Sequence, residues 1–418
     1  MDRDPSAFEG PDGAEMAEET PPAARASGAT FDWLIVGGGI HGTHVAVKLL
    51  DAGRTDIAGL CIVDPAPGLL ARWKARTAVT GMAFLRSPSM HHLDTEPYAL
   101  QRFARAGDTE PSEVFTAPND RPSLELFNTH SDGVVDAYGL ARAHVRGRAS
   151  AIEPGGERVR VRLATGQSLD ARRVVLALGL SDDFELPPWA PADDERVRHV
   201  FDPRGAPTGA GPVCVVGGGI SAAQVAIEHA RRGDAVVLVS RHAPRVHQYD
   251  SEPGWFGPKF MTDYERIDDA SERRRQIAGA RHRGSMPADV HAALVDAQRR
   301  GRVEVRIADV VGVDGSGDDA PPTGPLRVRL SDGTSHAAGR VLLATGFSSE
   351  RPGGAMVDSL AETASLPVAP CGFPVVDASL RWHPRIHVTG ALAELEIGPI
   401  ARNIAGARRA ADRIVAAR

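Results

Sequence analysis

The sequence predicts an α/β fold built from two units, each a parallel sheet with a β-meander, and three observations lead to this expectation. Segments 31–42 and 212–223 both join an apolar run to a glycine-rich turn and an amphipathic stretch. A second short apolar run follows each of them, and alternating segments follow later. Apolar runs that alternate with helical patterns are typical of βαβ units. We therefore expect two Rossmann-like domains in one chain.

The first glycine-rich turn has the spacing of a phosphate-binding fingerprint. The apolar run Phe31–Val36 precedes Gly37 and Gly39, and Gly42 opens the amphipathic stretch. The first glycine permits a tight turn, the second lets the backbone approach a pyrophosphate, and the third lets the helix lie close to the strand. Free amide N–H groups at the start of the helix would then face the phosphates.

The second turn repeats the pattern about 180 residues later. Here Pro212–Val216 precedes Gly217 and Gly219, and Ala222 takes the third small position. A single copy of this motif is weak evidence, because glycine turns between strand and helix occur in many folds. Two copies in the same arrangement predict that the chain binds two dinucleotides.

The residues at the end of each second strand indicate which nucleotides bind. Leu60–Val63 ends in Asp64, whose carboxylate suits a free ribose 2′-hydroxyl. Ala235–Val239 ends in Ser240 and Arg241, and an arginine beside a hydroxyl suits a 2′-phosphate. The second nucleotide is therefore predicted to be NADPH, with the alternative that Arg241 is only a solvated loop residue.

The order of the segments predicts that the second domain is inserted into the first. Meanders are expected at 158–167 and 326–334, and the apolar strands Arg173–Gly179 and Arg340–Gly346 are expected to carry the chain between the domains. The predicted parts are a disordered acidic tail (1–30), the first part of the first dinucleotide-binding domain (31–205), an inserted NADPH-binding domain (206–339) and the closing part of the first domain (340–418), and the family resemblance given below implies that the first domain binds FAD.

The composition of the chain argues against several classes of function. The net charge of −6 over 418 residues does not indicate a basic surface for nucleic acid, and no apolar run is long enough to cross a membrane. The first thirty residues lack the features of a secretion signal. Cys61, Cys214 and Cys371 lie far apart, so no dithiol motif exists and a cytoplasmic location is expected. The histidines are scattered, and we expect no metal site.

Two further segments are expected to lie near the cofactors. The excursion 244–300 of the second domain is rich in aromatic residues and prolines, and we expect it to be helical and to shape the active-site entrance. A structural cap is the alternative, and Arg273–Arg275 then form a solvated helix face. A closing strand at Arg385–Gly390 leads to a helix from about Pro399 to the end, whose N–H groups would face the flavin.

These features resemble the two-dinucleotide flavin monooxygenases, and among them the lysine and ornithine N-hydroxylating enzymes. The resemblance covers nearly everything after residue 30. Trp73 and Met82–Arg86 stand where that family has its Trp-His and Met-Gln-x-x-Phe-Leu segments beside the flavin ring, and Asp250–Phe260 resembles its Asp-Ser-x-Phe insert. Lys74, Ala83 and Gly257-Pro258 depart from the family pattern, so the amino-acid substrate stays open.

The resemblance implies an FAD-dependent, NADPH-using monooxygenase. NADPH would reduce FAD, the reduced flavin would take up O2 at C4a, and the resulting (hydro)peroxide would oxygenate a small molecule, with N-hydroxylation favoured. One alternative is a reductase that passes electrons to a protein or quinone acceptor, and another is a non-catalytic redox-sensing flavoprotein. No catalytic acid or base is predicted, because this chemistry needs none. Arg86 and His92 are conceivable substrate anchors, although each is more often a surface or core-edge residue.

The candidate cofactor-binding residues follow from the two fingerprints, the strand ends and the resemblance. They are Gly37, Gly39, Ile40, His41, Gly42, Asp64, Trp73, Met82, Gly179, Gly217, Gly219, Ile220, Ser221, Ala222, Ser240, Arg241, Gly346, Gly390, Pro399 and Ile400. The oligomeric state cannot be predicted from these patterns.

Overall fold

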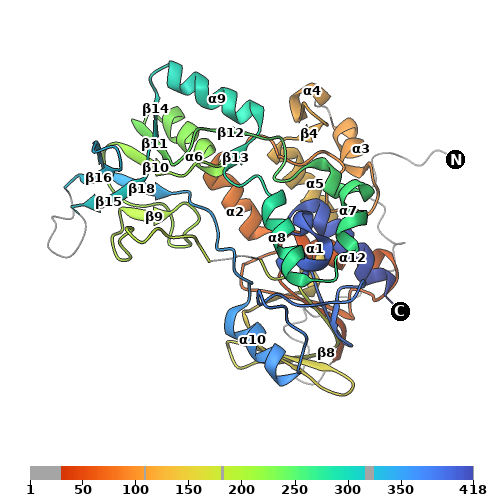
Figure 1. The fold of residues 1–418 in the computed structure, drawn as a ribbon. Helices are drawn as coiled ribbons and strands as arrows, with labels where there is room; N and C mark the ends of the chain where they lie inside the picture. The colour runs from red at the N-terminus through yellow and green to blue at the C-terminus, as the bar shows by residue number, and fades with distance from the viewer. Residues whose placement is uncertain (1–29, 108–109, 180–182, 316–323, 418) are drawn as a thin grey trace.

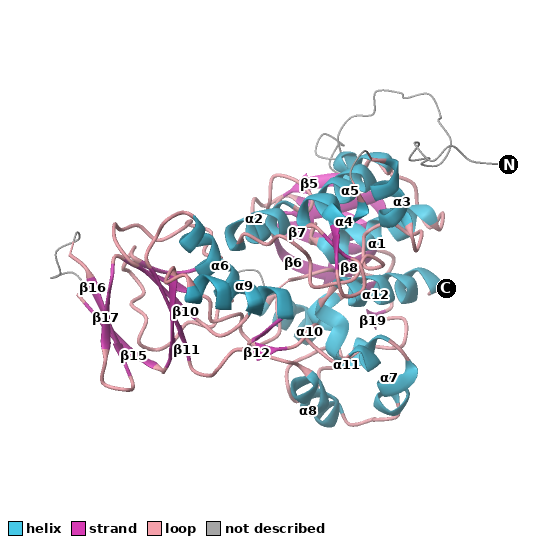
Figure 2. Ribbon diagram, turned by 90° about the horizontal axis from the view of Figure 1, so that it is seen from above, coloured by secondary structure: helices cyan, strands magenta, loops and turns pink. Residues whose placement is uncertain are grey.

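The computed structural model describes residues 30–107, 110–179, 183–315 and 324–417. The predicted acidic tail therefore lies, apart from Thr30, outside the described residues. The chain forms two lobes, each built around its own sheet (Figure 1). The view from above shows the lobes side by side, with β12 and α2 in the region where they meet (Figure 2).

The first lobe is built on an eight-stranded sheet with strand order β19-β20-β8-β1-β2-β5, to which β6 and β7 add an antiparallel meander through β8. Strands β1, β2, β5, β8 and β20 run parallel, as expected for a Rossmann-like core. The strands are β1 (Thr30–Val36), β2 (Leu60–Asp64), β5 (His144–Arg146), β6 (Ala149–Pro154), β7 (Val159–Leu163), β8 (Ser168–Leu176), β19 (Arg381–His383) and β20 (Ile386–Val388).

The second lobe is built on a parallel five-stranded sheet with strand order β14-β11-β10-β18-β9. A separate antiparallel meander lies beyond it at the end of the lobe (Figure 2). The strands of the sheet are β9 (Val197–His199), β10 (Val213–Val216), β11 (Val236–Ser240), β14 (Val303–Ile307) and β18 (Arg340–Leu343), and those of the meander are β15 (Val310–Asp314), β16 (Leu326–Leu330) and β17 (Ser335–Ala338).

This sheet extends past the limits that we predicted for the inserted unit. β9 lies before residue 206 and β18 begins at Arg340, yet β18 pairs with β10 on one side and with β9 on the other. Arg340–Leu343 is therefore a central strand of the second sheet before the chain returns to the first lobe. The apolar pattern alone identified a buried strand but not its sheet, because strand pairing is decided by residues distant in sequence.

Helices cover both sheets, and four short strands join loops at the edges of the lobes. The helices are α1 (Ile40–Asp51), α2 (Ala71–Thr80), α3 (Ala99–Ala106), α4 (Pro111–Val114), α5 (Leu124–Ala137), α6 (Ile220–Arg231), α7 (Pro258–Glu265), α8 (Ala270–Ala280), α9 (Ala288–Arg299), α10 (Gly354–Thr363), α11 (Glu394–Ile397) and α12 (Ile404–Ala416). Short 3₁₀ helices occur at η2 (Leu140–Ala143), η3 (Pro253–Phe256), η4 (Gly390–Ala393) and η5 (Pro399–Arg402). The short strands are β3 (Phe115–Thr116), β4 (Arg121–Pro122), β12 (Arg245–Val246) and β13 (Ser285–Met286).

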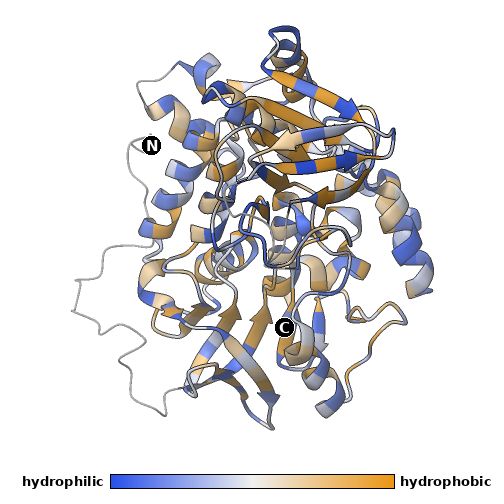
Figure 3. Cartoon of the chain, turned by 90° about the vertical axis from the view of Figure 1, so that its left-hand side faces the viewer, coloured by the Kyte–Doolittle hydropathy of each residue, from blue (hydrophilic) through white to orange (hydrophobic). Residues whose placement is uncertain are grey.

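The core lies between the sheets and their covering helices. Leu34 and Ile35 of β1 and Ile62 of β2 are fully buried. Many strands carry hydrophobic colour in Figure 3, although some strands in the upper part of the view also show hydrophilic stretches, and many helices show both colours. This distribution matches strands covered on both faces and helices that bury one stripe. Among the described residues, no helix combines the length and the apolar character needed to cross a membrane.

Candidate dinucleotide sites

A cavity of about 650 Å³ lies at the carboxyl ends of β1, β2 and β8. Ligands of open parallel sheets bind at this position, where the glycine-rich turn follows the first strand. The cavity wall includes seven of the predicted cofactor residues, which come from segments far apart in the sequence: Gly37, Gly39, Ile40, His41, Asp64, Gly179 and Gly390.

The first turn needs glycine for two different reasons. Gly37 has φ of +116°, and a Cβ atom there would collide with the carbonyl oxygen of Ala177. A Cβ on Gly42 would collide with the carbonyl oxygen of Gly37, so this glycine lets α1 lie close to β1. Gly39 differs, because a Cβ there meets nothing within 4 Å. The chain therefore leaves the space beside Gly39 open toward the cavity.

Asp64 is held in place by the turn that it faces. Its carboxylate accepts hydrogen bonds from the backbone amide of Gly38, at 2.7 Å, and from that of Ala66, at 2.8 Å. Asp64 thus lies at the end of β2 beside the glycine turn and within the cavity wall. This is the position that the sequence predicts for a ribose-binding carboxylate.

Several arginines in the cavity wall were not predicted. Arg72 and Arg76 lie one turn apart on α2, Arg148 follows β5, and Arg402 ends η5. The guanidinium of Arg76 also lies 4.9 Å from the ring centroid of Phe347. Guanidinium groups are well suited to bind phosphate oxygens. The i, i+4 spacing of Arg72 and Arg76 was the one sequence signal available for them.

His41 provides an uncharged ring in the cavity wall at neutral pH. Burial lowers its pKa to about 4, and backbone groups of Arg402 and Asn403 oppose this only in part. Its Nδ1 atom lies 3.0 Å from the hydroxyl of Thr389. His41 therefore joins the first glycine turn to the strand end before Gly390, where an added Cβ atom would lie 3.6 Å from the His41 ring.

A buried glutamate holds the closing segment beside the cavity. Glu394 is 0% exposed, and its carboxylate pairs with Arg402 at 2.7 Å, with Arg274 at 3.1 Å and with Arg281. The adjacent Glu396 pairs with Arg273 at 2.9 Å and with Arg413 at 2.8 Å. Arg402 thus reaches the cavity from a fixed position.

These ion pairs correct the interpretation of Arg273–Arg275 as a solvated helix face. Only Arg275 is exposed, where it pairs with Glu272, whereas Arg273 and Arg274 contact the closing segment of the first lobe. The excursion is helical, as predicted, with η3, α7 and α8. The hydroxyl of Tyr264 donates to the carbonyl of Leu395 at 2.8 Å, so α7 also packs on that segment. The excursion belongs to the second domain in sequence but covers part of the first lobe (Figure 1).

Besides the seven residues predicted for the second nucleotide, six predicted cofactor residues lie outside the cavity wall. Trp73 and Met82 pack in an apolar cluster with Ile40, and the Trp73 indole donates to Asn128 at 3.0 Å. The others are Gly42 behind the turn, Gly346 next to the lining residue Phe347, and Pro399 and Ile400 buried in η5. The last helix begins at Ile404 rather than near Pro399, because the Asn403 side chain caps it through the amide of Gly406.

The second fingerprint forms the same turn at the start of α6, which contains Ile220, Ser221 and Ala222. Gly217 has φ of +150°, and a Cβ there would collide with the carbonyl oxygen of Ala344. A Cβ on Gly219 would lie 3.5 Å from the Cα atom of Gly284. The loop that contains Gly284 therefore lies over this turn.

The two residues predicted to read a 2′-phosphate have different environments. Ser240 is 5% exposed, and its hydroxyl donates to the carbonyl of His242 at 2.7 Å, so it shapes the turn after β11. Arg241 is exposed. Arg241 is accordingly the better placed of the two to contact a ligand from solvent.

Both conceivable substrate anchors have hydrogen-bond partners within the protein. Arg86 donates to the carbonyls of His247, Gln248 and Tyr249, at 2.7 to 2.8 Å, and to the hydroxyl of Ser285. It therefore ties the first lobe to the excursion. His92 is buried, and its Nε2 atom lies 3.2 Å from the carbonyl of Pro97.

The cysteines offer no dithiol. All three are free, and burial raises the pKa of Cys61 and of Cys214 to about 12. A thiol that stays protonated at neutral pH is a poor nucleophile. These two residues serve as small apolar side chains in β2 and β10.

Comparisons with known proteins agree with this arrangement. The model of a family described as FAD-NAD(P)-binding matches residues 34–181. The ornithine hydroxylase of Pseudomonas aeruginosa has a TM-score of 0.71 at 18% identity, covering 93% of this chain and 98% of that one. The fold is that of the two-dinucleotide flavoproteins. The ornithine N-hydroxylase of Kutzneria sp. 744, solved with reduced FAD, NADP+ and L-ornithine, has a TM-score of 0.67 at 20% identity and the same coverage.

The fold is not confined to hydroxylases. The bacillithiol disulfide reductase of Bacillus cereus has a TM-score of 0.58 at 17% identity, again covering 93% of this chain and 98% of that one. A comparison with curated protein sequences finds no match. The prediction of two Rossmann-like domains, one inserted into the other and each with a meander, is confirmed at the level of the fold.

Proposed function

We propose that the protein is an FAD-dependent oxidoreductase that uses NADPH and acts as a monooxygenase on a small molecule, with N-hydroxylation of an amine favoured. One observation carries the proposal. The first fingerprint, Asp64, Gly179 and Gly390 meet in one cavity large enough for a dinucleotide. The likeness of the whole chain to two ornithine hydroxylases supports the choice of reaction class.

The residues in this cavity fit FAD. The open side of Gly39 and the amides of the turn suit a pyrophosphate, and Asp64 suits the adenosine ribose. Arg72, Arg76 and Arg402 supply positive charge within the same wall. Gly390 and the neutral His41 leave a small, uncharged surface where the closing segment meets the first turn.

Bound FAD would supply the transfer of electrons from NADPH and the activation of O2, which no protein side chain provides. The protein would position the two nucleotides and exclude water from the space between the lobes. The exposed Arg241 would contact the 2′-phosphate of NADPH, and the loop with Gly284 would shift to admit its pyrophosphate at Gly219. The three free cysteines fit a reducing cytoplasm.

The proposal is tested by following the electrons first from NADPH to the flavin and then from the flavin to O2. Purified protein is reconstituted with FAD, and NADPH is added without oxygen while the flavin absorbance is recorded. Reduced protein is then mixed with O2 in the presence of NADP+ in a stopped-flow instrument. We expect rapid bleaching, followed by an absorbing species that precedes the return of oxidised flavin.

The steady-state ratio of NADPH oxidation to O2 consumption and product formation distinguishes a monooxygenase from a reductase. With L-ornithine and related diamines as trial substrates, a monooxygenase consumes O2 in step with NADPH and forms a hydroxylated amine. A reductase oxidises NADPH only when a quinone or protein acceptor is added. NADPH oxidation that depends on such an acceptor, without oxygenated product from any amine, would refute the monooxygenase proposal. A protein that stays colourless with FAD would refute the flavoprotein proposal itself.

A further inference from the structure

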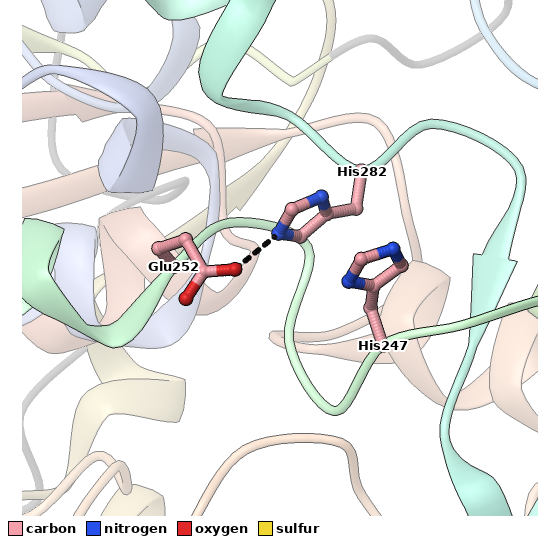
Figure 4. A group of neighbouring side chains, drawn as sticks. All are labelled: His247, Glu252 and His282. Carbon is pink, nitrogen blue, oxygen red and sulfur yellow. Dashed lines mark hydrogen bonds and ion pairs between the residues drawn. The ribbon is translucent and has the colours of Figure 1, made fainter.

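Two histidines and a glutamate converge outside the dinucleotide sites (Figure 4). His247 follows β12, Glu252 precedes η3, and His282 lies between α8 and β13. The possible ligand atoms of these three side chains all lie within 4.8 Å of one another. None of the three is used by the proposed oxidoreductase reaction. The sequence did not predict this cluster, because His247 and His282 are far apart along the chain.

The backbone that carries the three side chains is firmly held. The amide of His247 donates to the carbonyl of Met286 at 3.0 Å, and the amide of His282 donates to the carbonyl of Asp250 at 2.7 Å. Arg86 binds the carbonyl of His247 and the hydroxyl of Ser285, and that hydroxyl donates to the carbonyl of His282. Hydrogen bonds therefore hold the backbone of both histidines, which lie in the segments next to the paired strands β12 and β13.

The side chains themselves are only partly satisfied. The Nε2 atom of His282 lies 3.2 Å from a carboxylate oxygen of Glu252. The ring of His247 stacks on that of His282, with centroids 3.8 Å apart and planes 9° from parallel. Within the described chain, neither ring nitrogen of His247 has a hydrogen-bond partner. His247 thus brings a free imidazole nitrogen to a carboxylate that a second histidine already contacts.

We propose that His247, Glu252 and His282 bind a divalent transition-metal ion of the zinc class. Two imidazole nitrogens and one carboxylate oxygen form a ligand set used for zinc, with one position left for water. The same set disfavours magnesium and calcium, which prefer oxygen ligands. Because the two rings are stacked, their nitrogen lone pairs lie in two nearly parallel planes and do not meet at one ion, so binding requires the His247 ring to turn about its Cβ–Cγ bond. This torsion has a broad energy profile in histidine.

The charges of the side chains near the cluster are compatible with the binding of a cation. Two neighbouring guanidinium groups, those of Arg281 and Arg86, are occupied by Glu394 and by backbone carbonyls. The carboxylate of Asp250 also acts electrostatically on both arginines. Glu252 is 59% exposed and His282 is 22% exposed, so an ion can reach the cluster from solvent.

Because of where the site lies, a bound ion would also affect the loop that covers the second fingerprint. His282 is two residues before Gly284, which lies over the second fingerprint at Gly219. A bound ion would tie the 281–284 loop to the segment that contains His247 and Glu252. The metal proposal itself stands on the cluster alone and does not depend on the proposed function.

The test is zinc binding to the full chain without an affinity tag, after treatment with a chelator. Titration against a chromogenic zinc indicator should give one tight site per chain, and cobalt should give the visible absorption of a bound ion in the same site. Magnesium should not compete. Zinc should also slow hydrogen exchange of the amides in 247–252 and 281–286.

Three variants and one control decide the outcome. His247→Ala, His282→Ala and Glu252→Gln should each weaken zinc binding by at least about 10-fold. Glu252 is exposed, so its conservative replacement keeps the fold even if a histidine variant does not. His291→Ala, on α9, should bind zinc like the original protein. Equal zinc affinity in the original protein and Glu252→Gln, or an equal loss in His291→Ala, would overturn the proposal.

Discussion

Two glycines of the first turn differ in what they are needed for, one for the fold and the other for ligand binding. Gly37 has no room for a side chain and has a positive φ, whereas Gly39 has φ of −80° and open space beside it. An added methyl group at Gly39 therefore costs the fold little, but it occupies the space that a pyrophosphate needs.

We expect Gly39→Ala to fold with an unchanged thermal midpoint without cofactor and to lose FAD affinity by on the order of 10-fold or more. Gly37→Ala should lose both stability and FAD. Gly156→Ala, at an open surface position, is the control and should change neither. FAD binding is measured by fluorescence quenching and stability by thermal unfolding. If Gly39→Ala keeps full FAD affinity, the cavity is not the pyrophosphate site.

Arg241 provides the second prediction at this scale. A charge-assisted contact to a 2′-phosphate exists only with NADPH, so Arg241→Ala should weaken NADPH by about 10-fold or more and leave NADH almost unchanged. Arg231→Ala, on the exposed side of α6, should alter neither affinity. The measurement is a titration of flavin reduction against each coenzyme. Equal losses for both coenzymes would leave Arg241 without a phosphate-binding role.

Among the elements, those with local signals were predicted well. Period-two alternation and a glycine turn placed β16 and β17, and the apolar runs before Asp64 and Ser240 placed β2 and β11. The start of α12 was placed too early, because the buried segment Pro399–Arg402 forms a 3₁₀ helix before Asn403 caps the last helix.

Contacts between distant elements could not be predicted. Arg274 meets Glu394 across 120 positions of the sequence, and a charged triplet on a helix looks the same whether it faces water or a carboxylate. The pairing of β18 with β9 could not be predicted either, because it also joins residues that lie far apart in the sequence. The arginines of the first cavity come from α2, from the segment after β5 and from η5, so neither their meeting point nor the cluster of His247, Glu252 and His282 had a sequence motif.

The Glu394 cluster joins α8 to the closing segment, and its removal should be costly. Glu394→Gln leaves Arg274, Arg281 and Arg402 partly buried without their shared carboxylate. We expect the free energy of unfolding to fall by about 3 to 5 kcal/mol, as measured by urea denaturation. Glu272→Gln breaks the exposed pair with Arg275 and should have a far smaller effect. Equal effects of the two variants would contradict the structural role of the cluster.

At the scale of the whole molecule, stability depends on keeping many histidines neutral. Burial is the main cause that lowers the pKa of each of these side chains, to about 3 for His44 and His92 and to about 4 for His41, His130, His199 and His387. They occupy both lobes, so no single element accounts for the effect. Each is neutral in the folded protein at a pH where the unfolded chain already binds protons.

The stability of the protein should therefore be highest above about pH 6.5 and should fall as the pH decreases toward the folded-state values near 3 to 4. Unfolding in that range takes up protons, and each histidine can remove up to about 1.4 kcal/mol for every pH unit. Urea denaturation between about pH 7 and pH 5 measures the slope. His130→Phe keeps a ring between His92 and Phe103 but removes one titrating group, so its slope should be shallower. His291→Ala, on α9, is the control and should keep the original slope, because His291 is only half-buried and is not one of the six buried histidines. A slope that His130→Phe leaves unchanged would mean that the acid sensitivity arises elsewhere, in the carboxylates whose ion pairs join the lobes.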